Sequence, residues 1–458
     1  MQEWQRVAWV AAFAAGIAMA SPAAAQEKKI RVPSWAKAPP GGAELVAVDP
    51  EPEEAGPVTS AKPDGPRWRP EHLEWMRRFV ETPATDPLGR YALAQRLDRE
   101  IGAAAVREAI PHAFPYPAEA GGVYDRVVTL ADGTQVPYTV YVPSDYDRTT
   151  PYPMHIHLHG GGSSVTGKAS CFKNWGRRAK RRWALVCPST SEGRWWTPEG
   201  DAALEAVYQE VIQRLNIDTD RVSVGGLSNG GTGTWHLALK YPWQWSVVVP
   251  RCAARMTAHH ANMAGIWSYM IHGALDPKIK VENSRRMAEI LERMGQRFEY
   301  VEVPDGGHKF FPELTSPKLR WWMLNRKRAL RHRFIYTQLE GNDPGIIHWV
   351  EAPGLTGTLR GKLPPEVDSH RPGTPNTIEL RAGGEPLRSL RVYLPEERID
   401  LSDPVQIEFD GEVVFNGLVT PSAWDVLSSW DRTRDRRRVF MASVTVNAPG
   451  AEGAAASE

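Results

Sequence analysis

Residues 221–239, RVSVGGLSNGGTGTWHLAL, contain the pattern that decides the fold. An apolar β-run ends at Val224, a Gly-x-Ser-x-Gly occupies residues 226–230, and a helical pattern begins almost at once. A serine on such a tight strand–turn–helix connection is exposed in a strained conformation, with the positive end of a helix dipole behind it. This context predicts that Ser228 is a nucleophile rather than part of an ordinary glycine-rich turn.

A serine hydroxyl is a poor nucleophile without a base, so the chain must also supply a histidine. Of the 13 histidines, His308 stands in VPDGGHKFF, where the final strand of this region would end. Asp276 follows the strand-like run in SYMIHGALDPKI, which gives the chain order serine, acid, histidine. Asp305 is the competing acid, but it lies on the same loop as His308. We predict that Asp276 orients His308 and that His308 acts as the base.

Three consecutive glycines follow the upstream run MHIHL, in the segment HGGGSS. Such glycines let backbone N–H groups point at a carbonyl oxygen without obstruction by side chains. We predict that the N–H of Gly161 or Gly162, together with the N–H of Asn229 after the nucleophile, forms an oxyanion hole.

The run MHIHLH also raises a metal-binding alternative. His155, His157 and His159 alternate along a predicted strand, so their side chains would share one face, as zinc ligands could. No cluster of carboxylates accompanies them, and an interior strand would bury two of the three in the core. We therefore predict no metal site and no cofactor, with a zinc hydrolase as the alternative.

Strands and helices alternate over residues 120–333, which predicts an α/β domain with a mostly parallel sheet covered on both faces. Its first two strands are predicted to form a hairpin with a type I′ turn at Asp132-Gly133. Residues 334–447 show strand patterns only, with a second hairpin at Asp410-Gly411, and predict an all-β accessory domain.

The N-terminal part of the chain has three kinds of segment. Residues 1–25 contain an apolar run too short to span a bilayer, followed by Ala23-Ala24-Ala25, and predict a cleavable signal peptide, with an uncleaved membrane anchor as the alternative. Residues 26–70 are a proline-rich arm, and residues 71–119 show helical spacing. The tail, residues 448–458, is predicted to be disordered. The mature protein is therefore expected in the periplasm or the medium, without a membrane span.

Composition excludes several classes of protein. The 458 residues are 42% hydrophobic and 24% charged, which is typical of a soluble globular protein of two or three domains. The net charge of +1 provides no overall attraction to nucleic acid, and we interpret the arginine-rich runs at 177–182, 326–333 and 432–438 as solvated faces. We expect no nucleic-acid partner, and the sequence indicates no oligomeric state.

Cys171, Cys187 and Cys252 are the three cysteines. In an exported protein an odd number allows at most one disulfide and leaves one thiol over. The sequence does not indicate which pair is bonded, and three buried reduced thiols are an equally open alternative. No Cys/His spacing indicates structural zinc.

The 18 tryptophans include Trp195-Trp196, on a loop before the helix that leads to the nucleophile strand. If this loop overhangs the site, the rings could stack on a sugar or an aromatic acyl group, so both are weak candidates for substrate binding. The alternative is that they pack the loop onto the sheet.

The order HGGG, GLSNGG, HGALD and DGGH resembles the α/β-hydrolase fold. Over about residues 120–330 the chain is similar to secreted esterases related to poly(3-hydroxybutyrate) depolymerases, feruloyl and acetylxylan esterases, and to prolyl-oligopeptidase-like catalytic domains. The resemblance implies acyl-enzyme chemistry on a carboxylic ester, with Ser228, Asp276 and His308 in the roles given above, and it does not settle the acyl or alcohol group. We expect a polysaccharide-linked ester or a polyester as the substrate. The resemblance does not cover residues 26–119 or the C-terminal region.

Two alternatives to an esterase stay open at this point. One is a serine peptidase, because the same three side chains also cleave amides. The other is a non-catalytic binding protein in which the β-domain carries the function.

Overall fold

The structure, a computed structural model, describes residues 67–161, 167–175, 182–190, 194–254, 260–263, 265–314, 317–328, 334–339, 346–353, 355, 357–365, 376–384 and 389–448. The predicted signal peptide, most of the proline-rich arm and nearly all of the predicted tail lie outside these residues. In the part of the chain that is described, no helix combines the length and the apolar character that crossing a membrane requires.

An eight-stranded sheet forms the centre of the first region, in the order β1-β2-β4-β3-β5-β6-β7-β8. The pairs β1–β2 and β2–β4 are antiparallel, and all other pairs are parallel. The strands are β1 (Gly122–Thr129), β2 (Gln135–Val142), β3 (Tyr152–Leu158), β4 (Ala184–Pro188), β5 (Ile217–Leu227), β6 (Val247–Arg251), β7 (Trp267–Gly273) and β8 (Phe298–Val303). The predicted α/β fold with a mostly parallel sheet is confirmed.

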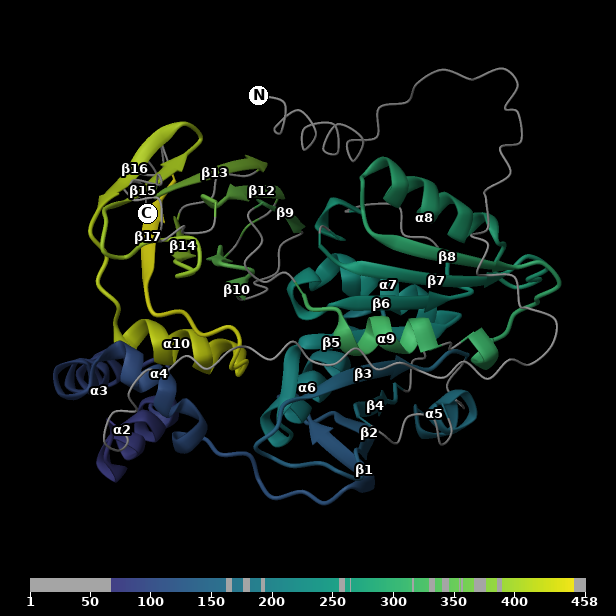
Figure 1. The fold of residues 1–458 in the computed structure, drawn as a ribbon, viewed down its shortest axis with the longest axis horizontal. Helices are drawn as coiled ribbons and strands as arrows, with labels where there is room; N and C mark the ends of the chain where they lie inside the picture. Colours follow the sequence, from purple (N-terminus) through teal and green to yellow (C-terminus); the bar gives the residue numbers. More distant parts are fainter. Residues whose placement is uncertain are drawn as a thin grey trace, which may run out of the picture.

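Helices lie on both faces of this sheet (Figure 1). An apolar layer fills the space between the sheet and the helices on each face. Along β7, Met270 packs into one layer and its neighbours Tyr269 and Ile271 into the other, because side chains alternate along a strand. The first layer includes helices α6, α7 and α8, and the second includes α5 and α9. The helices are α5 (Gly167–Trp175), α6 (Pro198–Arg214), α7 (Asn229–Lys240), α8 (Glu282–Arg293) and α9 (Pro317–Asn325), with short 3₁₀ turns at Pro242–Gln244, His260–Met263 and Pro312–Leu314.

The two predicted hairpin turns differ. At the second, Asp410 and Gly411 both have positive φ angles, 52° and 91°, as a type I′ turn requires. At the first, Gly133 has a φ of 87° but Asp132 is not among the residues with positive φ, so the type I′ prediction is wrong there. The Asp132 carboxylate instead accepts a hydrogen bond from the N–H of Thr134, and this local bond favours a longer loop.

Two sheets pack face to face in the C-terminal region and enclose one apolar core. Their orders are β10-β11-β14-β17 and β16-β15-β13-β12-β9, and the pairs are antiparallel except β13–β15. The strands are β9 (Phe334–Leu339), β10 (Ile346–Ile347), β11 (Val350–Glu351), β12 (Gly357–Lys362), β13 (Thr377–Gly384), β14 (Ser389–Tyr393), β15 (Val405–Phe409), β16 (Glu412–Gly417) and β17 (Ser443–Asn447). The expected β-rich region is present. We call these two sheets, together with the helices that pack beside them, the accessory region.

One helix, α10 (Ala423–Thr433), departs from the all-β expectation for this region. Ser422 caps its first turn by accepting a hydrogen bond from the N–H of Asp425. The helix buries Ala423, Val426, Leu427 and Trp430, which follow the spacing of one helix face, so the sequence carried a signal that was missed.

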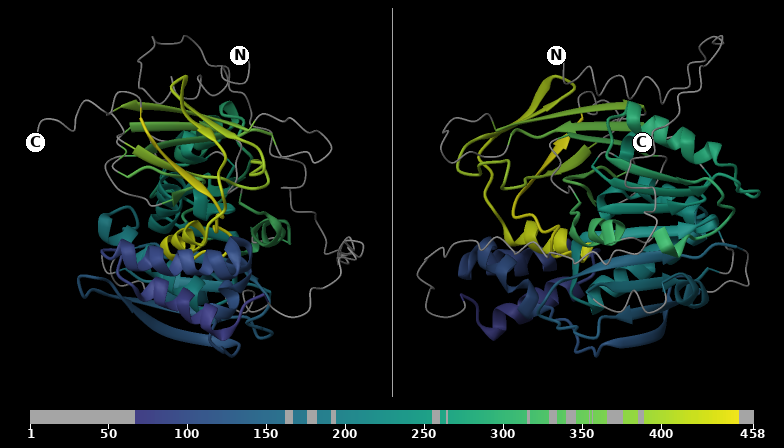
Figure 2. Two further views of the ribbon diagram at one scale, coloured as in Figure 1. Left: turned by 90° about the vertical axis from the view of Figure 1, so that its left-hand side faces the viewer. Right: turned by 45° about the vertical axis from the view of Figure 1, so that its right-hand side comes forward.

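Helix α10 packs on three helices from the other end of the chain (Figures 1 and 2). These are α2 (Pro70–Glu81), α3 (Pro87–Glu100) and α4 (Gly102–Ala113). Phe114 stacks on Trp430 with ring centroids 4.0 Å apart, and the Asp98 carboxylate accepts a 2.7 Å hydrogen bond from the N–H of Ala423. The N-terminal helices therefore share their apolar core with the C-terminal region, although more than 300 residues separate them in sequence.

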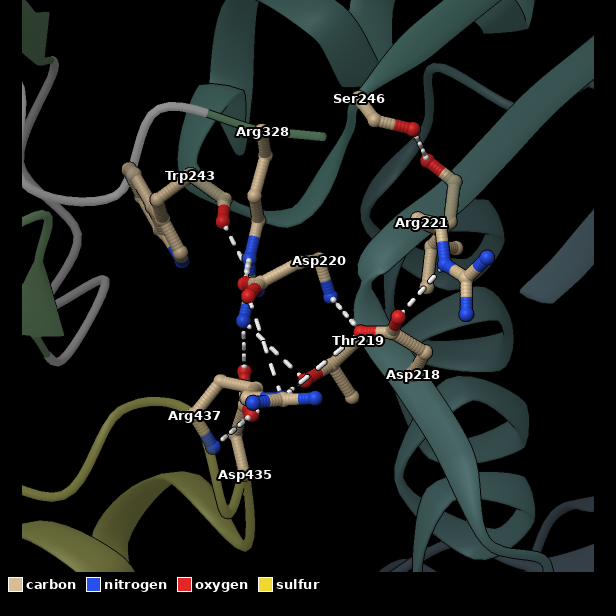
Figure 3. A network of polar contacts seen from close by, with 10 residues as sticks. Asp218, Thr219, Asp220, Arg221, Trp243, Ser246, Arg328, Asp435 and Arg437 are labelled. Carbon is tan, nitrogen blue, oxygen red and sulfur yellow. Dashed lines mark hydrogen bonds and ion pairs between the residues drawn. The ribbon is translucent and has the colours of Figure 1, made fainter. Parts of the chain in front are cut away.

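A buried polar network joins this accessory region to the large sheet (Figure 3). Arg328 donates to Asp435 at 2.7 Å, to Asp220 at 3.1 Å and to the carbonyl of Trp243 at 3.1 Å. Thr219 donates to the second carboxylate oxygen of Asp435. Because Thr219 and Asp220 lie near the start of β5, the accessory region docks at the amino end of the central strand.

The network corrects the interpretation of two arginine-rich runs as solvated faces. Arg328 and Arg438 are 6% and 5% exposed, in the runs at 326–333 and 432–438. Burial acts to raise the pKa of Asp435, but the charges of Arg328 and Arg438 outweigh it and hold that pKa below its ordinary value. Arginine runs look alike in sequence whether they face water or a carboxylate on another element.

Truncation of Leu427 tests the shared helical core. Leu427→Ala is expected to lower the free energy of unfolding by about 2–5 kcal/mol, because it removes a fully buried side chain from α10. Leu418→Ala, at a position that is 69% exposed, is the matched control and should change stability little. Equal effects of the two substitutions on urea unfolding would contradict the packing described here.

The buried ion pair makes a prediction about pH. Asp435→Asn should cost about 3 kcal/mol at neutral pH, because Arg328 stays buried without that carboxylate. Folding lowers the pKa of Asp435. The carboxylate therefore contributes to the free energy of unfolding at pH values above its ordinary pKa of 3.8, and this contribution is lost as the pH falls through the folded-state pKa. The stability difference from the unmodified protein should therefore shrink in acid. Asp403→Asn, at an exposed position, is the control and should change stability little at any pH. If the stability difference between Asp435→Asn and the unmodified protein did not change with pH, the prediction would be refuted.

Candidate active site

Ser228 occupies the turn between β5 and α7 in a strained conformation, with φ 61° and ψ −118°. The two flanking glycines make this turn possible. A Cβ at Gly226 would lie 2.4 Å from the carbonyl oxygen of Leu158, and a Cβ at Gly230 would lie 2.2 Å from the same oxygen. The Ser228 N–H donates a 3.0 Å hydrogen bond to the carbonyl of Arg251 at the end of β6. The predicted tight strand–turn–helix connection is present.

Asp276 and His308 are brought together from the loops after β7 and β8. The distance from His308 Nδ1 to Asp276 Oδ2 is 2.7 Å. The other carboxylate oxygen accepts hydrogen bonds from the N–H groups of Lys278 at 2.8 Å and Ile279 at 3.0 Å. Burial acts to raise the pKa of Asp276, but these hydrogen bonds and His308 outweigh it, so the pKa is lowered and the carboxylate stays ionised near neutral pH. Asp305, the competing acid, is exposed and is not bonded to His308.

All three residues lie at the same edge of the sheet. Ser228 follows β5, Asp276 follows β7 and His308 follows β8, and these strands are parallel. In open α/β sheets this carboxyl edge is where ligands bind. In the part of the chain that is described, Ser228 Oγ and His308 form no hydrogen bond, so these side chains must approach further for proton transfer, as is common without a bound substrate.

Cys252 is a residue of this neighbourhood that the sequence analysis did not connect with the site. Its thiol lies 3.5 Å from the carbonyl of Lys309, and its sulfur clusters with ligand atoms of Asp276 and His308. Burial raises the pKa of the thiol to about 11, so it is neutral at physiological pH. Cys252 follows β6 directly and so lies at the carboxyl edge of the sheet, and this position in the sequence could have indicated its closeness to the site.

The glycine-rich loop after β3 lies against the serine turn. A Cβ at Gly160 would lie 2.5 Å from the carbonyl oxygen of Leu227 and 3.3 Å from Cβ of Ser228. The Asn229 side-chain amide donates a 3.0 Å hydrogen bond to the carbonyl of Gly161, which has a φ of 82°. Gly162, the alternative donor for the oxyanion hole, lies outside the described residues.

The three alternating histidines of β3 have separate partners rather than a common centre. His155 contacts Ser223 Oγ at 2.9 Å, His157 contacts Ser170 Oγ at 2.9 Å, and His159 accepts from the N–H of Thr190 at 3.2 Å. All three are buried, and burial lowers the pKa of each, that of His157 to about 3. Among the described residues they form no cluster with metal-ligand spacing. They pack as neutral core side chains.

Trp195 is not available to a substrate in this structure, so its candidacy for substrate binding is corrected. Its side chain is fully buried, and its indole N–H donates a 2.9 Å hydrogen bond to the carbonyl of His159. It packs on Gly233 of α7, where a Cβ would lie 2.3 Å from Cβ of Trp195. Trp196 is half-buried and stays a candidate. Trp195 thus supports the backbone at the end of β3.

The cysteine pairing that the sequence left open is decided by the fold. A disulfide joins Cys171 in α5 to Cys187 in β4, with Cα atoms 6.3 Å apart, and Cys252 is free and buried. The bond links α5, in the second apolar layer, to β4 of the large sheet.

Part of this region matches a known protein family. Residues 201–315 match the family model described as phospholipase/carboxylesterase, and this segment runs from α6 through Ser228, Asp276 and His308 to just past the 3₁₀ turn at Pro312–Leu314. The chain contains an α/β-hydrolase domain. The predicted resemblance of this region to esterases is confirmed by this match and by a relative named as a feruloyl esterase.

The relatives that the α/β-hydrolase domain resembles are distant. An uncharacterized secreted protein of Arthroderma benhamiae is 26% identical over 38% of this chain and 23% of its own length. A probable feruloyl esterase C of Aspergillus niger is 24% identical over 39% of this chain and 71% of its own. The prolyl endopeptidase FAP of Mus musculus is 24% identical over 37% of this chain and 28% of its own. The chain thus spans about a quarter of the first of these relatives.

Among solved structures, that of a thermostable esterase has a TM-score of 0.41 and 21% identity, over 45% of this chain and 63% of that one.

The close approach of the two backbones at Gly230 gives a test of this geometry. Gly230→Ala should lower the free energy of unfolding by about 1–3 kcal/mol, because the added methyl group meets the Leu158 carbonyl at 2.2 Å. Gly307→Ala is the matched control, since a Cβ there meets nothing within 4 Å. Thermal unfolding of both variants measures the difference, and an unchanged melting temperature for Gly230→Ala would argue against the contact.

Proposed function

We propose that this protein is an exported serine hydrolase that cleaves carboxylic esters, with Ser228 as nucleophile, His308 as general base and Asp276 as the acid that orients His308. One observation carries the proposal. Ser228, held at a φ of 61° on the strand–helix turn, shares a sheet edge with a hydrogen-bonded Asp276–His308 pair. A strained serine beside an oriented histidine is the arrangement that acyl transfer requires.

The Asp276–His308 contact indicates how a proton would move. An ionised carboxylate only accepts hydrogen bonds, so His308 Nδ1 carries the hydrogen and Nε2 offers its lone pair. Nε2 would take the proton of Ser228 as Oγ attacks the ester carbonyl, and would return it to the leaving alcohol. Water would then repeat the two steps on the acyl-enzyme and release the carboxylic acid. This scheme uses no cofactor.

The negative charge that develops on the carbonyl oxygen needs hydrogen-bond donors. The N–H of Asn229 belongs to the first turn of α7, where backbone donors have no partner within the helix. We assign it to the oxyanion hole together with the N–H of Gly161 or Gly162. The hydrogen bond from the Asn229 side chain to the Gly161 carbonyl supports this pairing, because it couples the two segments.

A peptidase is the second candidate, and the similarity to a prolyl endopeptidase favours it. The same three side chains would cleave an amide by the same steps. The separate partners of His155, His157 and His159 give no support to a zinc hydrolase. A non-catalytic binding protein would not need the strained serine.

Export and substrate class are further parts of the proposal. The predicted signal peptide, the disulfide between Cys171 and Cys187 and a relative named as secreted support export. The feruloyl esterase relative makes feruloyl esters, including those linked to polysaccharide, the first substrates to test, with polyesters next.

Replacement of the nucleophile tests the proposed reaction. Ser228→Ala should lower kcat on p-nitrophenyl acetate and methyl ferulate by about four to six orders of magnitude, because it removes the hydroxyl proposed to form the acyl-enzyme. Ser402→Ala, at an exposed serine of the accessory region, is the control and should keep full activity. A serine-directed phosphonate should label the parent protein and not the Ser228 variant.

Three results would reject or redirect the proposal. Retained ester turnover in Ser228→Ala would reject the nucleophile. Loss of activity to a chelator, without sensitivity to the phosphonate, would indicate a metal-dependent hydrolase. Faster turnover of peptide p-nitroanilides than of esters would favour the peptidase.

A further inference from the structure

We propose that His272, a buried histidine outside the three proposed catalytic residues, is a positioning residue that holds Asp276 in place for His308. The inference rests on the proposed function and deepens it. His272 lies near the end of β7, four residues before Asp276, in the segment HGALD. The side chains of both residues are fully buried.

His272 reaches three groups around the Asp276 loop. Its Nε2 atom lies 2.9 Å from the carbonyl oxygen of Ile279 and 3.3 Å from Oδ2 of Asp276. Its Nδ1 atom lies 2.6 Å from Oγ of Ser284 on α8. The imidazole therefore spans the space between the loop and the helix that follows it.

These partners determine which nitrogen carries the hydrogen. A carbonyl oxygen only accepts hydrogen bonds, so Nε2 of His272 is the donor, and Nδ1 then accepts from the hydroxyl of Ser284. Burial lowers the pKa of His272 despite the opposing effects of the Ile279 carbonyl and the Asp276 charge, so the ring is neutral near pH 7. The Nε2–H group points between the Ile279 carbonyl and the carboxylate of Asp276.

This arrangement closes a ring of contacts around the carboxylate. Ile279 accepts from His272 through its carbonyl and donates through its N–H to Oδ1 of Asp276 at 3.0 Å. The longer contact from His272 Nε2 meets Oδ2, the same oxygen that bonds to His308. His272 stands on β7 and Ser284 on α8, so a strand and a helix set where the loop presents Asp276.

Loss of this support should weaken the Asp276–His308 contact without removing a group that touches substrate. A misplacement of about 1 Å away from the reacting atoms can cost about a hundredfold in rate. His272→Leu should therefore lower kcat by about 10- to 100-fold and leave KM unchanged. His272→Gln keeps an amide donor near the position of Nε2 and should restore most of the rate.

The test measures kcat and KM on p-nitrophenyl acetate for His272→Leu, His272→Gln, Asp276→Asn and the double variant His272→Leu/Asp276→Asn, in the full chain. His112→Leu, at an exposed histidine of α4, is the matched control and should behave like the parent. If His272 acts through Asp276, its removal costs nothing further once Asp276 is already asparagine. A full additional loss in the double variant, or unchanged kcat in His272→Leu, would overturn the proposal.

Two further measurements keep the inference decidable. Ser284→Ala removes only the partner of Nδ1 and should lower kcat by about threefold to tenfold, the effect of one hydrogen bond. If His272→Leu fails to fold, the kcat of Ser284→Ala tests the positioning role in its place. A kcat of Ser284→Ala equal to that of the parent protein would overturn the proposal.

Proton NMR does not depend on turnover. The low-field signal of the His308 Nδ1 proton should vanish in Asp276→Asn and move upfield in Ser284→Ala. An unmoved signal in Ser284→Ala would overturn the positioning role. Full activity of Asp276→Asn would instead reject the proposed function. The position of the His308 Nδ1 proton signal in Ser284→Ala would then still test whether His272 positions Asp276.

Discussion

The close approach of backbone segments at the carboxyl edge of the large sheet is the constraint on which the candidate site depends. The carbonyl oxygen of Leu158 lies where side chains at Gly226 or Gly230 would stand, so only glycine fits there. That approach lets β3 and its glycine-rich loop lie against the serine turn and holds Ser228 at a positive φ. The strain is local, and packing of the surrounding strands maintains it.

The acid and histidine side of the site is organised differently, by buried hydrogen bonds instead of steric fit. Asp276 receives two backbone N–H groups on one oxygen and two imidazoles on the other. Cys252, neutral through burial, lies beside this pair and contacts the loop of His308. Because the carboxylate is ionised and fixed, it selects the tautomer of His308 that leaves Nε2 free.

The accessory region is assembled from both ends of the chain. Helices α2, α3 and α4 share a core with α10, and Asp435 pairs with Arg328 at the amino end of β5. This docking site lies at the end of β5 opposite Ser228. The accessory region thus contacts the amino end of β5, and the loops that carry Ser228, Asp276 and His308 lie at the opposite, carboxyl edge of the sheet.

Local patterns in the sequence determined the strands and helices, the serine turn and the choice of Ser228, Asp276 and His308 as candidates, because periodicity and turn chemistry act over a few residues. Contacts between distant segments were decided only in the tertiary structure. The burial of Trp195 and Arg328, the pairing of Cys171 with Cys187, the partner of α10 and the contact of His272 with Asp276 are of this kind. A side chain's environment depends on which elements pack against it, and no local pattern records that choice.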